Sequence, residues 1–304
     1  MEGPSGFKEN GVEQEPVVDS KVILEFFRHG NKEKMAGPDE QIILSEKGRE
    51  QAQVKGQVLS PRSEVSLGFG SPRIRTQETA YRIMLANEDI VPDMSLEEIK
   101  KRISDEMGMV HMKKMIEDDR LNFALSGQVD VEGVQAYNEG RYLDWMLKES
   151  DTSARKYKDM TSTVYTRQVA GIAELCKRYL SVGAAFNRLV AKTNKYEEQN
   201  NQLERYMGTH GGVVDSFVSK ILEVTKGTEE RDKFLDAVGP GGFAETQGIR
   251  VEINNHGNEQ SLTFHYPAKE GEIVSDKSVM FGQQVLDSLI AERQAFDAEI
   301  AKED

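Results

Sequence analysis

The chain has little of what marks secreted, membrane-spanning or nucleic-acid-binding proteins. Its single cysteine, Cys176, cannot form an internal disulfide, and we expect it to pack as a small apolar group in a reducing, cytoplasmic setting. No apolar run reaches the roughly 18 residues that a membrane-spanning helix needs. The 39 Lys and Arg are outnumbered by 52 Asp and Glu, and the net charge of −13 disfavours nucleic acid as a partner.

The composition predicts one large globular domain behind a flexible lead-in. Residues 1–20 are rich in Gly, Glu, Pro and polar residues and lack the apolar stretch of a secretory signal, so we expect a disordered tail. With 304 residues, of which 38% are apolar, the chain is long enough to bury a sizeable core. We predict a single domain over residues 21–304, with a helical insertion at about residues 100–160.

The first hundred residues alternate between strand and helix patterns. Residues 21–27 are β-branched and aromatic, which is typical of a central strand, and Ser45 is placed to cap a following helix. Residues 65–69 predict a second strand, and a helix follows from Arg75. This order predicts an α/β fold of the three-layer sandwich type, with a mostly parallel sheet and helices on both faces. Ligands bind such sheets beyond the carboxyl ends of the strands.

The rest of the chain is expected to complete the sheet around the insertion. Residues 100–160 contain no convincing strand, whereas residues 161–194 have the apolar spacing of a long helix. A strand is predicted at 203–208, although Glu204 and Arg205 make it unusually polar. Residues 248–254 and 261–266 alternate as an antiparallel edge hairpin, and residues 278–300 are predicted as a helix.

Four segments, in a set order, carry the chemistry. Arg28-His29-Gly30 follows the first predicted strand, and Leu44-Ser45-Glu46-Lys47-Gly48-Arg49 opens the next helix. Ser71-Pro72-Arg73-Ile74-Arg75-Thr76-Gln77-Glu78-Thr79-Ala80 follows the second strand, and Thr209-His210-Gly211-Gly212 follows the polar one. Together they resemble the histidine phosphatase superfamily, the group that includes cofactor-dependent phosphoglycerate mutases. The resemblance extends over roughly residues 20–100 and 200–267.

The resemblance implies a phosphohistidine enzyme with His29 as the nucleophile. An imidazole is largely neutral at cytoplasmic pH, and the neighbouring Arg28 disfavours its protonated form further. Arg28 and Arg75 match the phosphate-binding arginines, whose planar donor forks suit phosphate oxygens. His210 matches the second histidine, which would help most as a cation. Asn31 occupies a position at which its amide could contact the phosphate.

The proton donor for the leaving oxygen has a less distinct signature. The residue after His210 is glycine, and in the matching branch of the family the acid is a glutamate about twenty residues beyond the arginine motif. Glu98, in Leu96-Glu97-Glu98-Ile99, fits that place. Ser95-x-x-Glu98 also has the pattern of a helix capping box, which is a purely local role. Glu97 and Glu139 remain as alternatives.

We therefore predict a phosphoric monoester hydrolase that acts on a small phosphorylated substrate of unknown identity. A phosphoglycerate-type mutase, a phosphate-binding protein with little turnover and an interaction scaffold are the alternatives. No cofactor is expected, and His111, His256 and His265 lack metal-ligand spacing, so no metal site is predicted. Lys32 and Lys34 are interpreted as solvated, no membrane partner is expected, and a homo-oligomer is left open.

Arg73 is the one residue of the arginine motif that matches no required position. We interpret it as an exposed arginine.

Overall fold

A mixed seven-stranded sheet forms the middle layer of the protein, in the order β3-β2-β4-β1-β5-β6-β7. The computed structural model describes residues 19–35, 37–61, 66–87, 93–107, 115–193, 197, 200–257 and 259–302. The predicted tail, apart from Asp19 and Ser20, lies outside these ranges, as does His111. The strands are β1 (Asp19–Arg28), β2 (Ser66–Gly70), β3 (Met115–Glu117), β4 (Gln202–Thr209), β5 (Gly248–His256), β6 (Glu259–Glu270) and β7 (Ile273–Phe281).

Half of the sheet is parallel, as predicted. β1 pairs in parallel with β4, β4 with β2, and β2 with β3. The register sets Arg28 opposite Thr209 and Gly70 opposite Gly208. The carboxyl ends of β1, β2 and β4 therefore finish at the same edge of the sheet.

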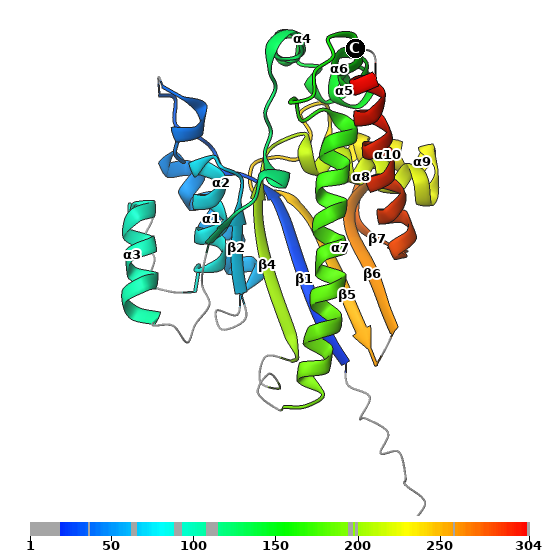
Figure 1. Ribbon diagram of the computed structural model, residues 1–304. Coiled ribbons are helices and arrows are strands. Elements are labelled where there is room, and N and C mark those ends of the chain that lie inside the picture. The colour runs from blue at the N-terminus through cyan, green and yellow to red at the C-terminus, as the bar shows by residue number, and fades with distance from the viewer. Residues whose placement is uncertain are drawn as a thin grey trace, which may run out of the picture.

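Helices cover both faces of the sheet, which confirms the predicted fold class (Figure 1). The helix α2 packs on β2 and β4 with α1 beside it, and α7 and α8 pack on the opposite face. The helices are α1 (Glu46–Leu59), α2 (Ile74–Met84), α3 (Leu96–Met107), α4 (Gly127–Asn138), α5 (Tyr142–Lys148), α6 (Ser150–Lys156), α7 (Tyr165–Val190), α8 (Val213–Lys226), α9 (Thr228–Val238) and α10 (Gln283–Lys302), with short turns η1 (Asp39–Gln41) and η3 (Asp119–Leu121). Within the described ranges, none of them is long and apolar enough to cross a bilayer.

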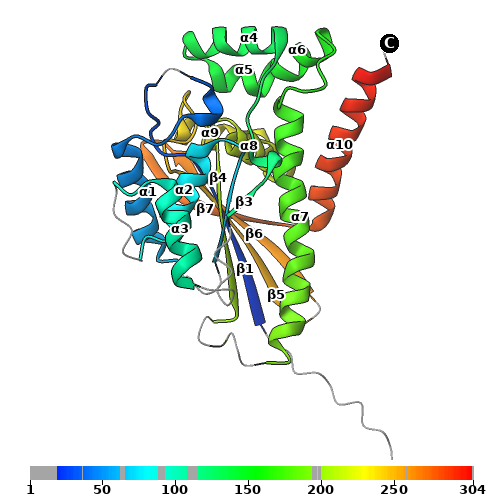
Figure 2. The ribbon, with the colours of Figure 1, turned by 60° about the vertical axis from the view of Figure 1, so that its left-hand side comes forward.

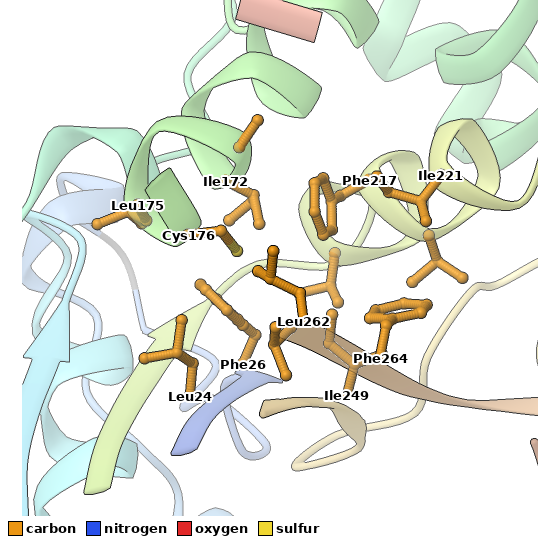
Figure 3. Close-up of a cluster of buried hydrophobic side chains, with 14 of the residues drawn as sticks. Leu24, Phe26, Ile172, Leu175, Cys176, Phe217, Ile221, Ile249, Leu262 and Phe264 are labelled. Atoms are coloured by element: carbon orange, nitrogen blue, oxygen red, sulfur yellow. The ribbon is translucent and has the colours of Figure 1, made fainter. Parts of the chain in front are cut away.

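The main core lies between the sheet and the helices α7 and α8. Alternate residues of β1, namely Val22, Leu24 and Phe26, are fully buried and face this side. Figure 3 shows Leu24 and Phe26 among side chains of α7, α8, β5 and β6. Cys176 lies in this cluster, and its burial raises the pKa of the thiol to about 12, so it packs and is not reactive at neutral pH.

The polar residues of β4 are buried and have partners. Glu204 accepts hydrogen bonds from Ser66 Oγ at 3.0 Å and from the Tyr206 hydroxyl at 2.9 Å. On the opposite face the Arg205 guanidinium lies 5.6 Å from the ring centre of Tyr179 on α7. These contacts explain how a central strand can carry charges that the sequence pattern does not favour, because a buried polar group costs little once it is paired.

Three short helices lie over the carboxyl ends of the strands. Figures 1 and 2 show α4, α5 and α6 beyond the end of the sheet at which β1 and β4 finish. Their apolar side chains, including Trp145 and Met146, form a separate cluster with Phe296 and Ile300 of α10. The expectation that residues 100–160 hold no strand is wrong, because residues 115–117 form β3. A three-residue strand is too short to show a periodic pattern in the sequence. It is recognised only by its hydrogen bonding to β2.

The antiparallel half contains one strand more than predicted. The hairpin of β5 and β6 is present, but β7 pairs along β6, so β6 is not the edge strand. Residues 278–281 were predicted as the start of a helix and belong to β7; α10 begins at Gln283. Only Val279 and Phe281 of β7 are buried, so most of this strand lacks the alternation that identifies a half-buried strand.

Candidate active site

The three parallel strand ends bring the sequence motifs together in one pocket. Arg28, His29, Arg75 and His210 all line a cavity of about 510 Å³. The rings of His29 and His210 lie 5.4 Å apart between centres, and Arg75 Nε is 3.2 Å from His29 Nε2. The convergence expected from the sequence is therefore present in the structure.

Buried contacts fix the loop that carries His29. The Gly30 amide donates to Thr79 Oγ1 at 3.1 Å, so the middle of α2 holds the end of β1. The start of α1 lies against the same loop, since a Cβ on Gly48 would lie 2.0 Å from the carbonyl oxygen of Asn31. Only glycine permits this approach. Ser45 caps α1 as predicted, and its Oγ accepts from the Gly48 amide at 3.2 Å.

The hydrogen bonds of His29 define which ring nitrogen carries the proton and which is unprotonated. Nδ1 lies 2.7 Å from the Gly30 carbonyl oxygen, which can only accept, so Nδ1 carries the proton. Nε2 is the unprotonated nitrogen, and in this structure its one lone pair accepts from Arg75 Nε–H at 3.2 Å. Burial lowers the pKa of His29 to about 3, and the nearby Arg75, Arg28 and Lys32 cations lower it as well. The imidazole is therefore neutral at physiological pH.

His210 is buried beside His29 and is also neutral. Its Nε2 lies 2.8 Å from Ser71 Oγ, and the ring is 4% exposed. Burial lowers the pKa of His210 well below its ordinary value, and His29 and Arg75 add to the effect. From the sequence, this histidine would help most as a cation; in this structure burial, with the nearby positive charge, favours the neutral ring. Ser71 was not singled out in the sequence, although it belongs to the arginine motif.

Arg73 joins Arg28 and Arg75 at the pocket, contrary to its interpretation as an exposed arginine. Its side chain is 11% exposed and donates to the Asn122 side chain at 3.2 Å and to the Phe123 carbonyl. Burial lowers the pKa values of Arg73 and Arg75 to about 10, so both remain cationic. Arg28 donates through Nη1 to the Phe243 carbonyl at 2.8 Å, and its buried Nε has no hydrogen-bond partner among the described residues.

Asp39 supplies the anion that faces these cations. Its carboxylate accepts from Arg75 Nη2 at 2.8 Å and forms ion pairs with Arg73 and, at 3.4 Å, with Lys32. Arg75 Nη1 also donates to the Asp39 carbonyl at 2.6 Å. Asp39 belongs to η1, in the loop after the Arg28-His29-Gly30 motif, and no sequence pattern identified it. Lys32 was interpreted as solvated; it lines the pocket while its side chain remains 48% exposed.

Asn31 is not brought to the pocket. Its side-chain amide donates to Glu245 Oε1 at 2.7 Å, and its Oδ1 accepts from Ser45 Oγ at 2.7 Å. Both ends of the amide are thus engaged with the start of α1 and the loop before β5, so Asn31 braces the motif and does not face the cavity.

The structure also leaves the three proposed acids outside the pocket. Glu98 accepts from the Ser95 amide at 2.7 Å while its own amide donates to Ser95 Oγ at 3.2 Å, which is the capping box in full. Its carboxylate is exposed, and α3 lies at the outer side of the molecule beside α1 (Figure 1). Glu97 is exposed and pairs with Lys100, and Glu139 pairs with Arg141.

The carboxylates that do line the cavity are Asp39 and Asp130. Asp130 lies in the first turn of α4, in a region that the sequence resemblance does not cover. The described residues contain no cluster of His, Cys, Asp and Glu with the arrangement of a metal site.

Comparisons with known proteins point to one family. Residues 24–124 match the family model of the histidine phosphatase superfamily (branch 1). The motif resemblance is confirmed. The matched segment contains the histidine phosphatase motifs around His29 and Arg75, and His210 lies beyond it. No curated protein sequence matches the chain.

Solved structures with a similar fold include several phosphatases. A mycobacterial glucosyl-3-phosphoglycerate phosphatase is 15% identical and aligns over 79% of this chain and 92% of its own, with a TM-score of 0.41. An Entamoeba histolytica phosphoserine phosphatase, in complex with 3-phosphoglyceric acid, is 15% identical over 83% of this chain and 98% of its own, with a TM-score of 0.39. These similarities concern the fold alone.

Proposed function

We propose that the protein is a phosphomonoesterase that works through a phosphohistidine on His29. The observation that carries this proposal is the pairing of a neutral His29, held by Gly30 through Nδ1, with Arg75 directly beside the unprotonated Nε2. Attack requires Arg75 Nε–H to turn from Nε2 to an oxygen of the bound phosphate. A nucleophile must present a lone pair, and a phosphate must be neutralised next to it. Arg28, Arg75 and His210 surround that position.

The proposed reaction has two steps. In the first, the His29 Nε2 lone pair forms a bond to phosphorus while the bond from phosphorus to the ester oxygen breaks, and the leaving oxygen takes up a proton. In the second, water attacks phosphorus and gives a proton to the group that protonated the leaving oxygen, the N–P bond breaks with its electron pair returning to Nε2, and inorganic phosphate leaves. Arg28 and Arg75 stabilise the charge on the equatorial oxygens in both steps.

Asp130 is our candidate for the proton donor. It lines the cavity from α4, and no ion-pair partner contacts it among the described residues, whereas Asp39 is held by three cations. Cations stabilise the charged form of a carboxylate, so Asp39 is poorly suited to carry a proton.

The open mouth of the pocket favours hydrolysis over a mutase reaction. Tyr137, which lines the cavity, is 70% exposed, so the cavity is open to solvent on that side. A mutase has to keep water from the phosphorylated enzyme until the phosphoryl group returns to the substrate. With 3-phosphoglycerate as substrate, isomerisation that outpaces phosphate release would overturn this choice.

Trapping the phosphorylated enzyme tests the mechanism. The wild-type protein is mixed with a radiolabelled phosphate ester and quenched in alkali, in which phosphohistidine survives. Label should appear on the wild type and be absent from His29→Asn. His256→Asn is the matched control, because His256 is exposed at the end of β5 and pairs with Asp19.

Unlabelled wild type that still binds inorganic phosphate tightly would favour a binding protein without turnover. Equal labelling of the wild type and His29→Asn would place the nucleophile elsewhere.

A further inference from the structure

The cavity extends well beyond the space that a phosphate group fills. At about 510 Å³ it has the size of a site for an organic molecule. Its floor carries the cations described above. The side beneath α4 and α5 is formed by Phe123, Leu125, Val134, Tyr137 and Tyr142, which we call the aromatic wall.

The helix α4 presents one face to this cavity. Asp130, Gly133, Val134 and Tyr137 all line it, and their spacing places them on a single side of a helix. Val134 is 50% and Tyr137 is 70% exposed, so these large apolar side chains do not belong to a core. A Cβ on Gly133 would lie 2.5 Å from Leu125 Cδ1, which shows how closely α4 is seated on the segment below it.

A continuous row of aromatic rings leads from the nucleophile to the mouth of the cavity. The distances between ring centres are 5.4 Å from His29 to His210, 6.4 Å from His210 to Phe123 and 5.7 Å from Phe123 to Tyr142. Tyr137 continues the row at 6.3 Å from Tyr142. Such rings offer edges and faces to a further aromatic group.

The aromatic wall offers no cation to a negatively charged substituent on the organic part of a ligand. Between residues 123 and 142, all of which the structure describes, the one charged residue that lines the cavity is Asp130. A second phosphate or a carboxylate held against the wall would meet apolar carbon and this carboxyl group, and none of the lining residues between 123 and 142 is a cation. The Tyr142 hydroxyl is buried and has no hydrogen-bond partner among the described residues.

We propose that the aromatic wall binds the organic part of the substrate, and that this part is an uncharged aromatic or extended apolar group bearing a single phosphate. The inference rests on the proposed function for the placement of the phosphate at His29. It goes further in naming the substrate class, which excludes compact phosphorylated sugars and acids.

Inert phosphonates separate binding from catalysis. Calorimetry would compare 3-phenylpropylphosphonate with propylphosphonate and 3-carboxypropylphosphonate on the wild-type protein. The phenyl group lies three carbons from phosphorus, so it leaves the ionisation of the head group nearly unchanged. We expect the phenyl compound to bind about tenfold tighter than propylphosphonate, because it buries a ring against the wall, and the carboxylate compound to bind more weakly.

Variants assign the preference to the wall. Tyr137→Ser should bring the ratio of the dissociation constants for propylphosphonate and 3-phenylpropylphosphonate close to one. Because the Tyr137 side chain is highly exposed, the substitution should not disturb folding. Val131→Ser is the matched control: Val131 lies on the same helix and is 54% exposed, but it does not line the cavity. That variant should keep the wild-type ratio.

Each result decides between the two proposals. Equal affinities of the wild type for the phenyl and propyl compounds, no phosphonate binding at all, or equal effects of the two variants would overturn the inference. A clear preference for the phenyl compound without hydrolysis of the corresponding phosphate esters would leave the aromatic wall in place and refute the phosphatase function alone.

Discussion

Replacing Asp39 by asparagine is expected to tighten the binding of phosphate. The Asp39 carboxylate holds Arg75 Nη2 at 2.8 Å and pairs with Arg73 and Lys32, and these are the cations that a phosphate needs. A phosphate that binds beside His29 must compete with this carboxylate. The asparagine side chain would be nearly the same size but would carry no charge, so the competition would weaken.

The size of the effect follows from the exposure of the pair. Two unit charges about 4 Å apart interact by roughly 4 kcal/mol at an effective dielectric constant of about 20, which is an upper bound. Exposed ion pairs contribute about 1 kcal/mol or less. The Asp39 side chain is 39% exposed but contacts three cations, so we place the gain at about 1 to 2 kcal/mol. This corresponds to phosphate binding that is about 5- to 30-fold tighter.

The inhibition constant of inorganic phosphate and its dissociation constant by calorimetry are the measurements. The gain should shrink at high salt, because screening weakens the charge interactions of a partly exposed residue. Glu40→Gln is the control: it removes the same charge from the same turn, is exposed, and acts on Arg75 only through space. We expect a change of no more than about twofold for it.

Equal gains from Asp39→Asn and Glu40→Gln would refute the reasoning, since net charge and not competition would then be the cause. Weaker phosphate binding by Asp39→Asn would show that the carboxylate orients Arg75 for the ligand.

Three further predictions concern Glu98, His29 and Asp130. Glu98→Gln should leave kcat/KM within about twofold and lower Tm slightly, because Glu98 serves the capping box; a hundredfold loss would restore it as the acid. His29 should show no titration by NMR between pH 5 and 8, and a midpoint near 6.5 would contradict its burial. The pKa of His29 is about 6.5 in the unfolded chain and about 3 in the folded protein. The contribution of the neutral His29 to the free energy of unfolding is therefore complete above pH 6.5 and is lost as the pH falls toward 3. Asp130→Asn should lower kcat about 10²- to 10⁴-fold for alkyl phosphates but far less for p-nitrophenyl phosphate, whose leaving group needs no proton, and equal losses would exclude it as the donor.

The part of the site that could be predicted from the sequence is the part held by the sheet. Arg28-His29-Gly30 and Thr209-His210 directly follow parallel strands that pair in register, so their meeting place follows from topology. Arg75 follows the third of these strands within one turn of α2. The same reasoning identifies the parallel half of the fold, in which buried strands alternate with helices.

The part that could not be predicted comes from segments without a repeated pattern. Asp39 lies in a short turn, and Asp130 and Tyr137 lie on a helix whose cavity-facing side chains are polar, small or exposed, so amphipathic spacing does not reveal them. Arg73 is two residues from Arg75, and its role depends on carbonyl and amide partners at Asn122 and Phe123 that only the fold brings near.

Glu98 shows how a local pattern can match two roles at once. The capping box is complete within four residues and needs no tertiary contact, whereas a catalytic acid requires the whole helix to lie against the pocket. When both interpretations fit, the local one has the lower entropic cost, because its partners are already neighbours in the chain. Asn31 is a different case, because its amide is engaged by Ser45 and Glu245, which only the fold brings beside it.

The charge of the pocket differs in sign from the charge of the whole chain. The net charge is −13, yet the cavity is lined by Arg28, Lys32, Arg73 and Arg75 against the two carboxylates Asp39 and Asp130. Because salt screens charges beyond about 8 Å, the distant acidic surface has little influence on a phosphate inside the pocket. Burial and mutual repulsion lower the pKa of Arg73 to about 10, which means that these cations are costly to hold together without an anion. Asp39 reduces that cost in this structure, and a bound phosphate would reduce it further because it carries more charge. Burial and the nearby cations keep both histidines neutral, so the cations that would attract the proposed substrate also favour the unprotonated state of the His29 nitrogen that would attack it.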